Sequence, residues 1–439
     1  MNGTATHVGD LPSGSRYRID VPADWNGAGW NGIVLLFSHP VPVPPGAPPW
    51  DHEPLIDHLV ANGYAVAASA NTIFWPLELA LSDHPGLLEV VKRTLGPARH
   101  TIAVGLSIGG IITAGLVQTF PDDLSGALPM CGNLAGAVGI HNREFDIAFV
   151  IKTLMAADTD LKITGITDPG PNLLLARRLL REAQETESGR ARLALAAAVG
   201  NIAGWHDPVS PEPASDDVDA RQRNQFAWFA EIGFLVYFWA REQVERQAGG
   251  NPSWNTDIDY RSLLATSINR DVVEALYARA GLDLDADLER LAREPRIVAD
   301  PSAVDYLERH IVFSGDLGGV PVLTVHTDGD GLVTPDNERA YAEVVRHAGQ
   351  EELLRQLYVH RAGHCTMTFA EVRIALDVLV ERIESGRWPE HGPDALNSAA
   401  DLLGPEGKEL KSGGVAEASF FEFEPRPFPR RHDAAVRSR

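Results

Sequence analysis

The run His100–Ile111 constrains the fold more than any other part of the sequence, because an apolar, β-branched stretch leads directly into a Gly-Leu-Ser-Ile-Gly motif at 105–109. A helical pattern follows at 111–120. A Gly-x-Ser-x-Gly motif between a strand and a helix is typical of a tight turn that exposes a nucleophilic serine, and glycine tolerates the positive φ and the close packing of such turns. The sequence therefore predicts Ser107 as a nucleophile, with the N–H of Ile108 directed at the reacting carbonyl.

A glycine-rich turn before a helix can also hold a phosphate, and this alternative has to be weighed. No lysine follows the glycines of the motif, which argues against a Walker-type loop. No Gly-x-Gly-x-x-Gly run is present there to indicate a dinucleotide site. Because a strand precedes the motif and a helix follows it, the nucleophile interpretation is favoured.

The charge of the chain limits the classes of partner that it can bind. The 439 residues carry a formal net charge of −22, and the pI is about 5.0, which argues against a nucleic-acid or anionic-membrane partner. The longest apolar stretch, at 226–240, contains Glu231 and is too short to span a bilayer. We therefore expect a small-molecule substrate, no nucleic-acid partner and no membrane, while a homo-oligomer stays open.

Cysteine usage and the N-terminus bear on cofactors and location. Only two cysteines occur, Cys131 and Cys365, which excludes a disulfide-rich scaffold and a multi-cysteine metal site. We predict no metal and no cofactor.

The first seven residues lack the basic and apolar regions of a signal peptide. The given N-terminus thus predicts a cytoplasmic protein, or a secreted one if a signal peptide was trimmed.

Strands and helices alternate at both ends of the chain. Continuous apolar runs predict buried strands, and a shorter alternating stretch at 17–21 predicts an early antiparallel strand with a hairpin. The predicted buried strands lie at 33–37, 64–68, 100–104, 126–131, 320–326 and 357–360. Helical spacing is found at 51–62, 77–95, 111–120, 336–348 and 368–385. This rhythm predicts an α/β fold with a mostly parallel, twisted sheet flanked by helices.

The middle of the chain shows no convincing buried strand. Its patterns are helical, at 144–156, 172–203, 220–246, 272–280 and 286–292. We therefore predict a large helical cap at 135–315, inserted after the sixth strand between two core segments at 1–134 and 316–387. The tail at 388–439 is rich in Pro, Gly and charge. We expect its apolar island at 420–423 to pack back on the body, and 430–439 to be disordered.

A nucleophilic serine needs a base, and the base needs an acid that holds its tautomer. The loop after the strand at 320–326 offers two carboxylates, Asp328 and Asp330. The spacing to Val333 and Pro335 favours Asp330 over Asp328. The alternative is a plain Asp-Gly turn before a helix cap.

The base is expected after the next strand. The loop that follows 357–360 contains His364, and the neighbouring Gly363 allows a tight turn that can swing the ring over the strand ends. His326 and His360 fall within predicted strands and are the strongest competing histidines. The sequence therefore predicts His364 as the base.

Ser107, Asp330 and His364 follow one another in the order nucleophile, acid, histidine. With Ser-His-Pro at 38–40, they make the sequence resemble the α/β-hydrolase superfamily over about 16–387. The resemblance implies a serine hydrolase that cleaves carboxylic esters through an acyl-enzyme. An amidase or peptidase with the same triad, a lyase or haloperoxidase, and a non-catalytic binding protein on the same fold remain as alternatives.

More narrowly, the sequence is similar to a group of capped bacterial hydrolases. That group carries a Val-Pro-x-x-Trp-Asn-Gly motif near its start, Pro-Met-Cys-Gly after the sixth strand and Gly-His-Cys at the histidine. These motifs stand here at 21–27, 129–132 and 363–365. The narrower resemblance implies no particular substrate.

The chain departs from many of these relatives at the oxyanion loop. They have His-Gly where this chain has His39-Pro40. Proline has no N–H to donate. The resemblance points instead to the next residue, Val41, whose N–H would join that of Ile108 in binding the developing oxyanion.

The two cysteines flank the expected site. Cys365 directly follows His364, and Cys131 ends the strand beside the nucleophile strand, so a disulfide between them is geometrically plausible; two free buried thiols are the alternative. Tannase-like and feruloyl-esterase-like enzymes also tie a cysteine after the histidine to one near the serine. Theirs directly precedes the serine, whereas this chain has Leu106 there.

An aromatic segment at 225–239 lies inside the predicted cap. On a helix its apolar side chains would cover every face, which is typical of a helix buried all round. Packing in the core of the cap is favoured. The alternative is that the segment lines an apolar pocket over Ser107, which would imply a substrate with an apolar part.

Overall fold

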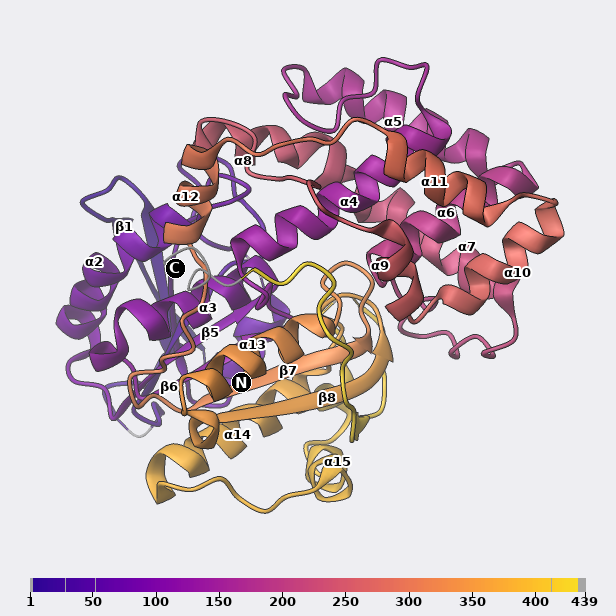
Figure 1. The fold of residues 1–439 in the computed structure, drawn as a ribbon. Helices are drawn as coiled ribbons and strands as arrows, with labels where there is room; N and C mark the ends of the chain where they lie inside the picture. The colour runs from indigo at the N-terminus through magenta and orange to yellow at the C-terminus, as the bar shows by residue number, and fades with distance from the viewer. Residues whose placement is uncertain (1–2, 28, 52, 412, 433–439) are drawn as a thin grey trace.

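The computed structural model describes residues 3–27, 29–51, 53–411 and 413–432. Within this part of the chain, nine strands form one sheet in the order β1-β2-β4-β3-β5-β6-β7-β8-β9. Strands β3 to β8 run parallel, and β1, β2 and β9 pair antiparallel with their neighbours. The predicted mostly parallel sheet is confirmed (Figure 1). The strands are β1 Thr4–Asp10, β2 Arg16–Pro22, β3 Ile33–Ser38, β4 Ala65–Ser69, β5 His100–Leu106, β6 Gly126–Met130, β7 Val322–Gly329, β8 Leu354–Ala362 and β9 Phe420–Phe421.

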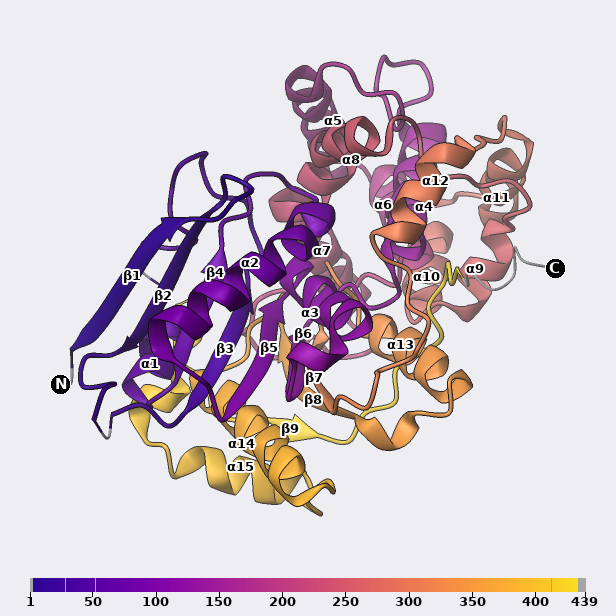
Figure 2. The same cartoon turned by 90° about the vertical axis from the view of Figure 1, so that its left-hand side faces the viewer.

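Helices cover both faces of the sheet, because the side chains of its strands alternate between two apolar clusters. In β3, Val34 and Leu36 belong to one cluster, and Leu35 and Phe37 belong to the other. The first cluster is covered by α2 Leu77–Leu95, α3 Ile108–Thr119 and α13 Asp336–His347. The second is covered by α1 Pro54–Ala61, α14 Phe369–Ser385 and α15 Pro393–Asp401, which Figure 2 shows together below the sheet.

Most of the helices between β6 and β7 share a core of their own. These inserted helices lie together beyond one end of the sheet (Figures 1 and 2). They are α4 Ala137–Met155, α5 Pro169–Gln184, α6 Glu187–Val199, α7 Val218–Trp228, α8 Arg241–Ala248, α9 Tyr260–Thr266, α10 Arg270–Ala280, α11 Leu284–Arg293 and α12 Pro301–Arg309. Val244 of α8 and Val304 and Leu307 of α12 instead pack into the core of the sheet. Short 3₁₀ turns elsewhere span Pro121–Asp123, Glu351–Leu353 and Pro405–Lys408.

Two of the predicted helices in this segment are divided. The helix predicted at 172–203 breaks before Glu187, where the Thr186 hydroxyl accepts a hydrogen bond from the N–H of Gly189 at 3.0 Å and starts α6. The helix predicted at 220–246 changes to π-helical turns at Phe229–Gly233 and Val236–Ala240. Helices α9 and α12 were not predicted.

The C-terminal tail packs on the body more extensively than expected. The apolar island forms β9, which pairs with Tyr358 and Val359 of β8. Arg430 is buried and forms an ion pair with Asp146 of α4, so the prediction of disorder is wrong there, because the guanidinium meets a buried carboxylate. Residues 433–439, which share that prediction, lie outside the described residues.

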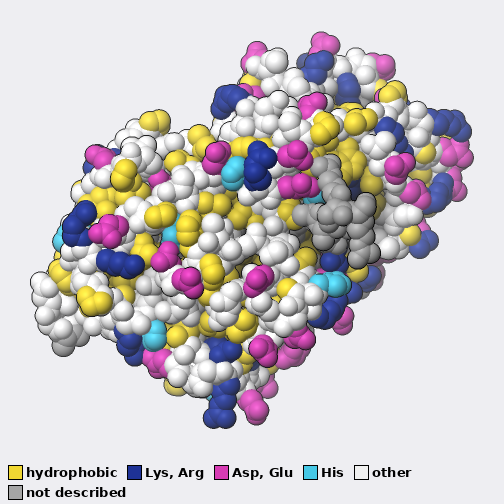
Figure 3. Space-filling view, turned by 60° about the vertical axis from the view of Figure 1, so that its left-hand side comes forward, with side chains coloured by type: hydrophobic (Ala, Val, Ile, Leu, Met, Phe, Trp, Pro, Cys, Tyr) yellow, Lys and Arg dark blue, Asp and Glu magenta, His cyan; other side chains and the backbone are white. Residues whose placement is uncertain are grey.

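Figure 3 shows acidic and basic side chains interspersed over one face of the molecule. Among the described residues, no helix combines the length and apolarity needed to cross a membrane.

Candidate active site

Ser107 stands on a strained turn between β5 and α3. Its φ of 58° and ψ of −122° are unusual for a residue with a side chain, and its N–H donates to the Met130 carbonyl at 2.9 Å. A Cβ at Gly109 would lie 2.1 Å from the Ser38 oxygen, and one at Gly105 would lie 2.3 Å from the Gly109 oxygen. Both glycines are therefore required by close backbone packing, as the motif predicts.

The structure brings Asp330 and His364 together. His364 Nδ1 and Asp330 Oδ2 are 2.6 Å apart, and Asp330 is fully buried. Its other oxygen accepts the N–H groups of Leu332 and Val333 at 2.9 and 3.0 Å. Burial alone would raise the pKa of Asp330 and lower that of His364, but the attraction between the two groups shifts both pKa values the opposite way.

Asp328, the alternative acid, contacts a different histidine. It lies within β7, which extends three residues beyond the predicted strand end at 326. Its Oδ2 is 2.8 Å from Nδ1 of His360, a side chain that is 43% exposed. Its Oδ1 accepts the N–H of Arg361 at 3.0 Å. The structure therefore brings Asp330 to His364 and leaves Asp328 with His360.

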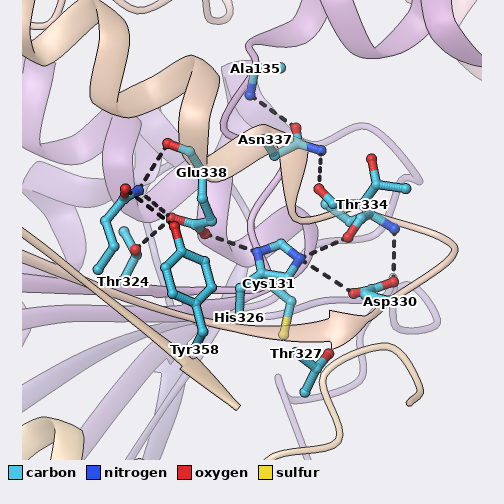
Figure 4. Close-up of polar contacts among 12 residues, drawn as sticks. Cys131, Ala135, Thr324, His326, Thr327, Asp330, Thr334, Asn337, Glu338 and Tyr358 are labelled. Carbon is cyan, nitrogen blue, oxygen red and sulfur yellow. Dashed lines mark hydrogen bonds and ion pairs between the residues drawn. The ribbon is translucent and has the colours of Figure 1, made fainter. Parts of the chain in front are cut away.

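Behind Asp330 lies a buried polar network around His326 (Figure 4). His326 Nδ1 is 2.9 Å from Glu338 Oε1, and Nε2 is 2.8 Å from the Val333 carbonyl and 3.6 Å from Asp330 Oδ2. All three titratable side chains are fully buried. Sequence reasoning treated His326 as a competing histidine and gave no signal for Glu338, which comes from the first turn of α13.

The hydrogen bonds indicate the protonation of His326. The Val333 carbonyl can only accept, so Nε2 carries a hydrogen. Thr324 and Gln356 donate to Glu338 Oε2 at 2.5 and 2.8 Å, which is what an ionised carboxylate accepts. Burial would lower the pKa of His326, but the nearby carboxylates of Asp330 and Glu338 raise it to about 10. His326 is therefore a buried imidazolium.

Ser107 and His364 line the same cavity, whose volume is about 340 Å³. Its walls are mostly apolar. The polar or ionisable side chains on it, besides Ser107 and His364, are Asn133, His141, Glu144, Cys365 and Lys411. Larger hollows of about 640 and 820 Å³ lie elsewhere and contain none of the three predicted site residues.

Both predicted oxyanion donors border this cavity. Ile108 is the first residue of α3, where a backbone N–H has no partner inside the helix. Val41 belongs to the loop after β3, and its side chain is 61% exposed. Their positions are compatible with the predicted role, which stays a prediction.

Some residues of the aromatic segment at 225–239 pack in the core of the inserted helices, and others line the cavity. Phe229, Phe234 and Phe238 are buried in the core of the inserted helices. Ile232 and Val236, from the π-helical region, line the cavity beside Ser107. The inserted helices thus supply apolar wall to the site.

Both cysteines are free thiols in the structure. Cys131 Sγ lies 3.6 Å from the Met367 sulfur, and Cys365 Sγ lies 3.5 Å from His364 Nε2. Burial would raise the pKa of Cys365, but its neighbours Cys131 and His364 lower it. The disulfide between the two cysteines stays a prediction.

The described part of the chain holds no group of three or more His, Cys, Asp or Glu side chains placed to bind a metal ion.

Comparisons with known proteins give one relative by sequence. The chain is 28% identical over 424 residues to an o-phthalyl amidase of Xanthobacter agilis, and the alignment covers 90% of this chain and 90% of the amidase. No family model matches.

Solved structures were also compared. Feruloyl esterase B of Aspergillus oryzae superposes with a TM-score of 0.46 at 13% identity, over 88% of this chain and 82% of that chain. The rice cell wall degrading esterase LipA of Xanthomonas oryzae superposes with a TM-score of 0.39 at 11% identity, over 86% and 88%.

The topology itself identifies the architecture. The sheet is mostly parallel, with β2 antiparallel next to β4, and a strained serine turn follows the central strand β5. The residues that follow β7 and β8 meet at the same edge of the sheet, as the carboxyl ends of parallel strands must. The chain therefore has the α/β-hydrolase fold.

Proposed function

We propose that the protein is a serine hydrolase that cleaves carboxylic esters through an acyl-enzyme on Ser107. The observation that carries the proposal is the 2.6 Å contact between His364 and the buried Asp330. His364 in turn lines the cavity that contains the strained Ser107. A serine hydroxyl needs such a base, and a base of this kind needs a fixed tautomer.

In the proposed reaction, His364 Nε2 removes the proton of Ser107 as the hydroxyl attacks the substrate carbonyl. Asp330 holds the hydrogen on Nδ1 and stabilises the imidazolium that forms. The N–H groups of Ile108 and Val41 would bind the oxyanion. His364 then protonates the leaving group and afterwards activates the water that releases the acid.

The shape of the site supports a substrate with an apolar part. The cavity walls include Phe74 and Leu106 from the core, with Ile232 and Val236 from the inserted helices. On this basis the segment at 135–315 acts as a cap over a core made of 1–134 and 316–387, and the described part of the tail at 388–439 packs against both.

An amidase is the second candidate, and the sequence relative favours it. That relative is an o-phthalyl amidase, and the alignment spans 90% of both chains. Hydrolysis of an amide uses the same three residues but makes protonation of the leaving nitrogen by His364 more important. The candidate substrates are amides of aromatic carboxylic acids, including 2-carboxybenzoyl amides.

The first experiment is intact-protein mass spectrometry after treatment with a fluorophosphonate, with Ser107→Ala as the matched control. A single adduct on the wild type and none on the variant supports an activated serine at 107. Rates with p-nitrophenyl esters and the corresponding p-nitroanilides then separate the ester from the amide hypothesis. A folded wild type that forms no adduct, although a small probe enters the cavity, contradicts the hydrolase mechanism and favours a binding protein.

A further inference from the structure

We propose that Lys411 makes the site selective for substrates that carry a carboxylate in addition to the bond that is cleaved. The inference rests on the proposed hydrolase function and names its substrate class. Among the described residues, Lys411 is the one lysine or arginine that lines the cavity containing Ser107 and His364. It comes from the C-terminal tail, far from both in the sequence.

Lys411 is held in place by the residues before it. Leu410 is buried and pairs with Thr368, the N-cap of α14, and the Glu409 carbonyl accepts the N–H of Phe369 at 3.0 Å. The same turn is closed by the Gly413 N–H, which donates to the Leu410 carbonyl at 2.9 Å. The ammonium is therefore presented by a tethered turn.

The Lys411 ammonium forms an ion pair and remains partly exposed. Its contact with a carboxylate is to Glu53 Oε2, at 3.5 Å, and the Lys411 side chain stays 21% exposed. An ammonium has three N–H donors, so it can donate to Glu53 and still donate to a second anionic oxygen. Burial, and then the positive charge of Lys411, lower the pKa of His39 to about 3, so this neighbour is neutral and does not compete for an anion.

The carboxylate on the cavity wall, Glu144, already has a hydrogen-bond partner. Glu144 Oε2 lies 3.0 Å from His141 Nδ1, and both side chains come from α4. The cavity therefore combines apolar walls, a histidine–glutamate pair and a partly exposed ammonium. Because a carboxylate gains a charge-assisted hydrogen bond from an ammonium, an apolar acid derivative with a second carboxylate fits this arrangement better than an uncharged one.

The experiment compares kcat/KM for two pairs of esters, corrected for spontaneous hydrolysis. One pair places the charge on the acyl part: p-nitrophenyl benzoate and p-nitrophenyl 4-carboxybenzoate. The other places it on the leaving group: phenyl benzoate and 4-carboxyphenyl benzoate. Each pair is measured with the wild type, Lys411→Met, Lys411→Glu and a matched control, Lys408→Met. Lys408 lies in the same tail and pairs with Glu417, but does not line the cavity.

We expect the wild type to prefer the carboxylated ester in at least one pair. Lys411→Met should lower that preference about 10- to 100-fold, the usual value of a hydrogen bond to a charged group. Lys411→Glu should lower it further, and Lys408→Met should keep it.

Two results overturn the inference alone: a wild type that cleaves the uncharged ester faster in both pairs, or a preference that survives Lys411→Met. If no ester is cleaved and no fluorophosphonate adduct forms on Ser107, the proposed function itself has failed.

Discussion

Replacing Glu338 by glutamine should convert the buried cation at His326 into a neutral ring. The carbonyl oxygen of the new amide can accept the donors that Thr324 and Gln356 direct at Glu338. The amide N–H can donate to an unprotonated Nδ1 of His326, while Nε2–H still reaches the Val333 carbonyl. The exchange therefore removes a charge while keeping the shape and the hydrogen bonds, and the variant should fold.

The size of the effect follows from the pKa of His326. The ordinary value is 6.5 and the folded value is about 10, so the folded protein keeps a proton that the unfolded chain loses between these values. At about 1.36 kcal/mol per pKa unit, this contributes up to about 5 kcal/mol to stability. That contribution is complete below pH 6.5 and is lost as the pH rises through about 10. A neutral His326 makes no such contribution, so we expect Glu338→Gln to remove roughly 3 kcal/mol of the loss between pH 7 and pH 9.5.

The assay is urea denaturation at pH 7 and pH 9.5, at matched ionic strength. The free energy of unfolding should fall less between the two pH values in Glu338→Gln than in the wild type. Glu274→Gln is the control, because Glu274 forms an exposed pair with Arg270 at 2.7 Å. It should keep the wild-type fall. If Glu338→Gln shows the same fall as the wild type, His326 is not the buried cation inferred here.

Three further predictions concern the acid, the base and the tail. Asp330→Asn should lower kcat about 10⁴-fold, because the tautomer of His364 is no longer held, whereas Asp328→Asn should keep most of the activity; steady-state rates on the best ester decide between them. Because the pKa of His364 lies well above 6.5, kcat/KM should still be rising with pH above 6.5, and a plateau reached below that pH would contradict the assignment. Arg430→Met leaves Asp146 buried without its counter-charge and should cost about 3–5 kcal/mol of stability, which denaturant titration would reveal.

The sheet was largely predictable because its strands are continuous apolar runs buried on both faces. The helix predicted at 77–95 matches α2, and the motif at 105–109 located the serine turn. Strand β1 was missed because its residues alternate between half-buried and exposed and carry few large apolar side chains. Helices as short as α9 leave too few turns for a periodic pattern to register.

Site residues were predictable from the sequence where a motif defines a local turn. They were less predictable where contacts between separate elements determine which side chains reach the site. The choice between Asp328 and Asp330 depends on how β7 ends, and its pairing with β8 is irregular between Thr327 and Gly329. Glu338 reaches His326 because α13 packs back on β7, and Lys411 reaches the cavity from the C-terminal tail. Nothing in their local sequence distinguishes them from surface charges.

The two-residue strand β9 has a consequence for assembly. It pairs with Tyr358 and Val359 in the middle of β8, a nine-residue strand that would otherwise form an open edge of the sheet. An open edge of that length is a template for strand addition by another molecule. The Ser419 carbonyl, which accepts the N–H of His360 at 2.8 Å, extends the cover by one more bond. The C-terminal tail that contains Lys411 thus also limits pairing of β8 with another molecule. Deleting this tail would therefore lower the solubility of the protein as well as its selectivity.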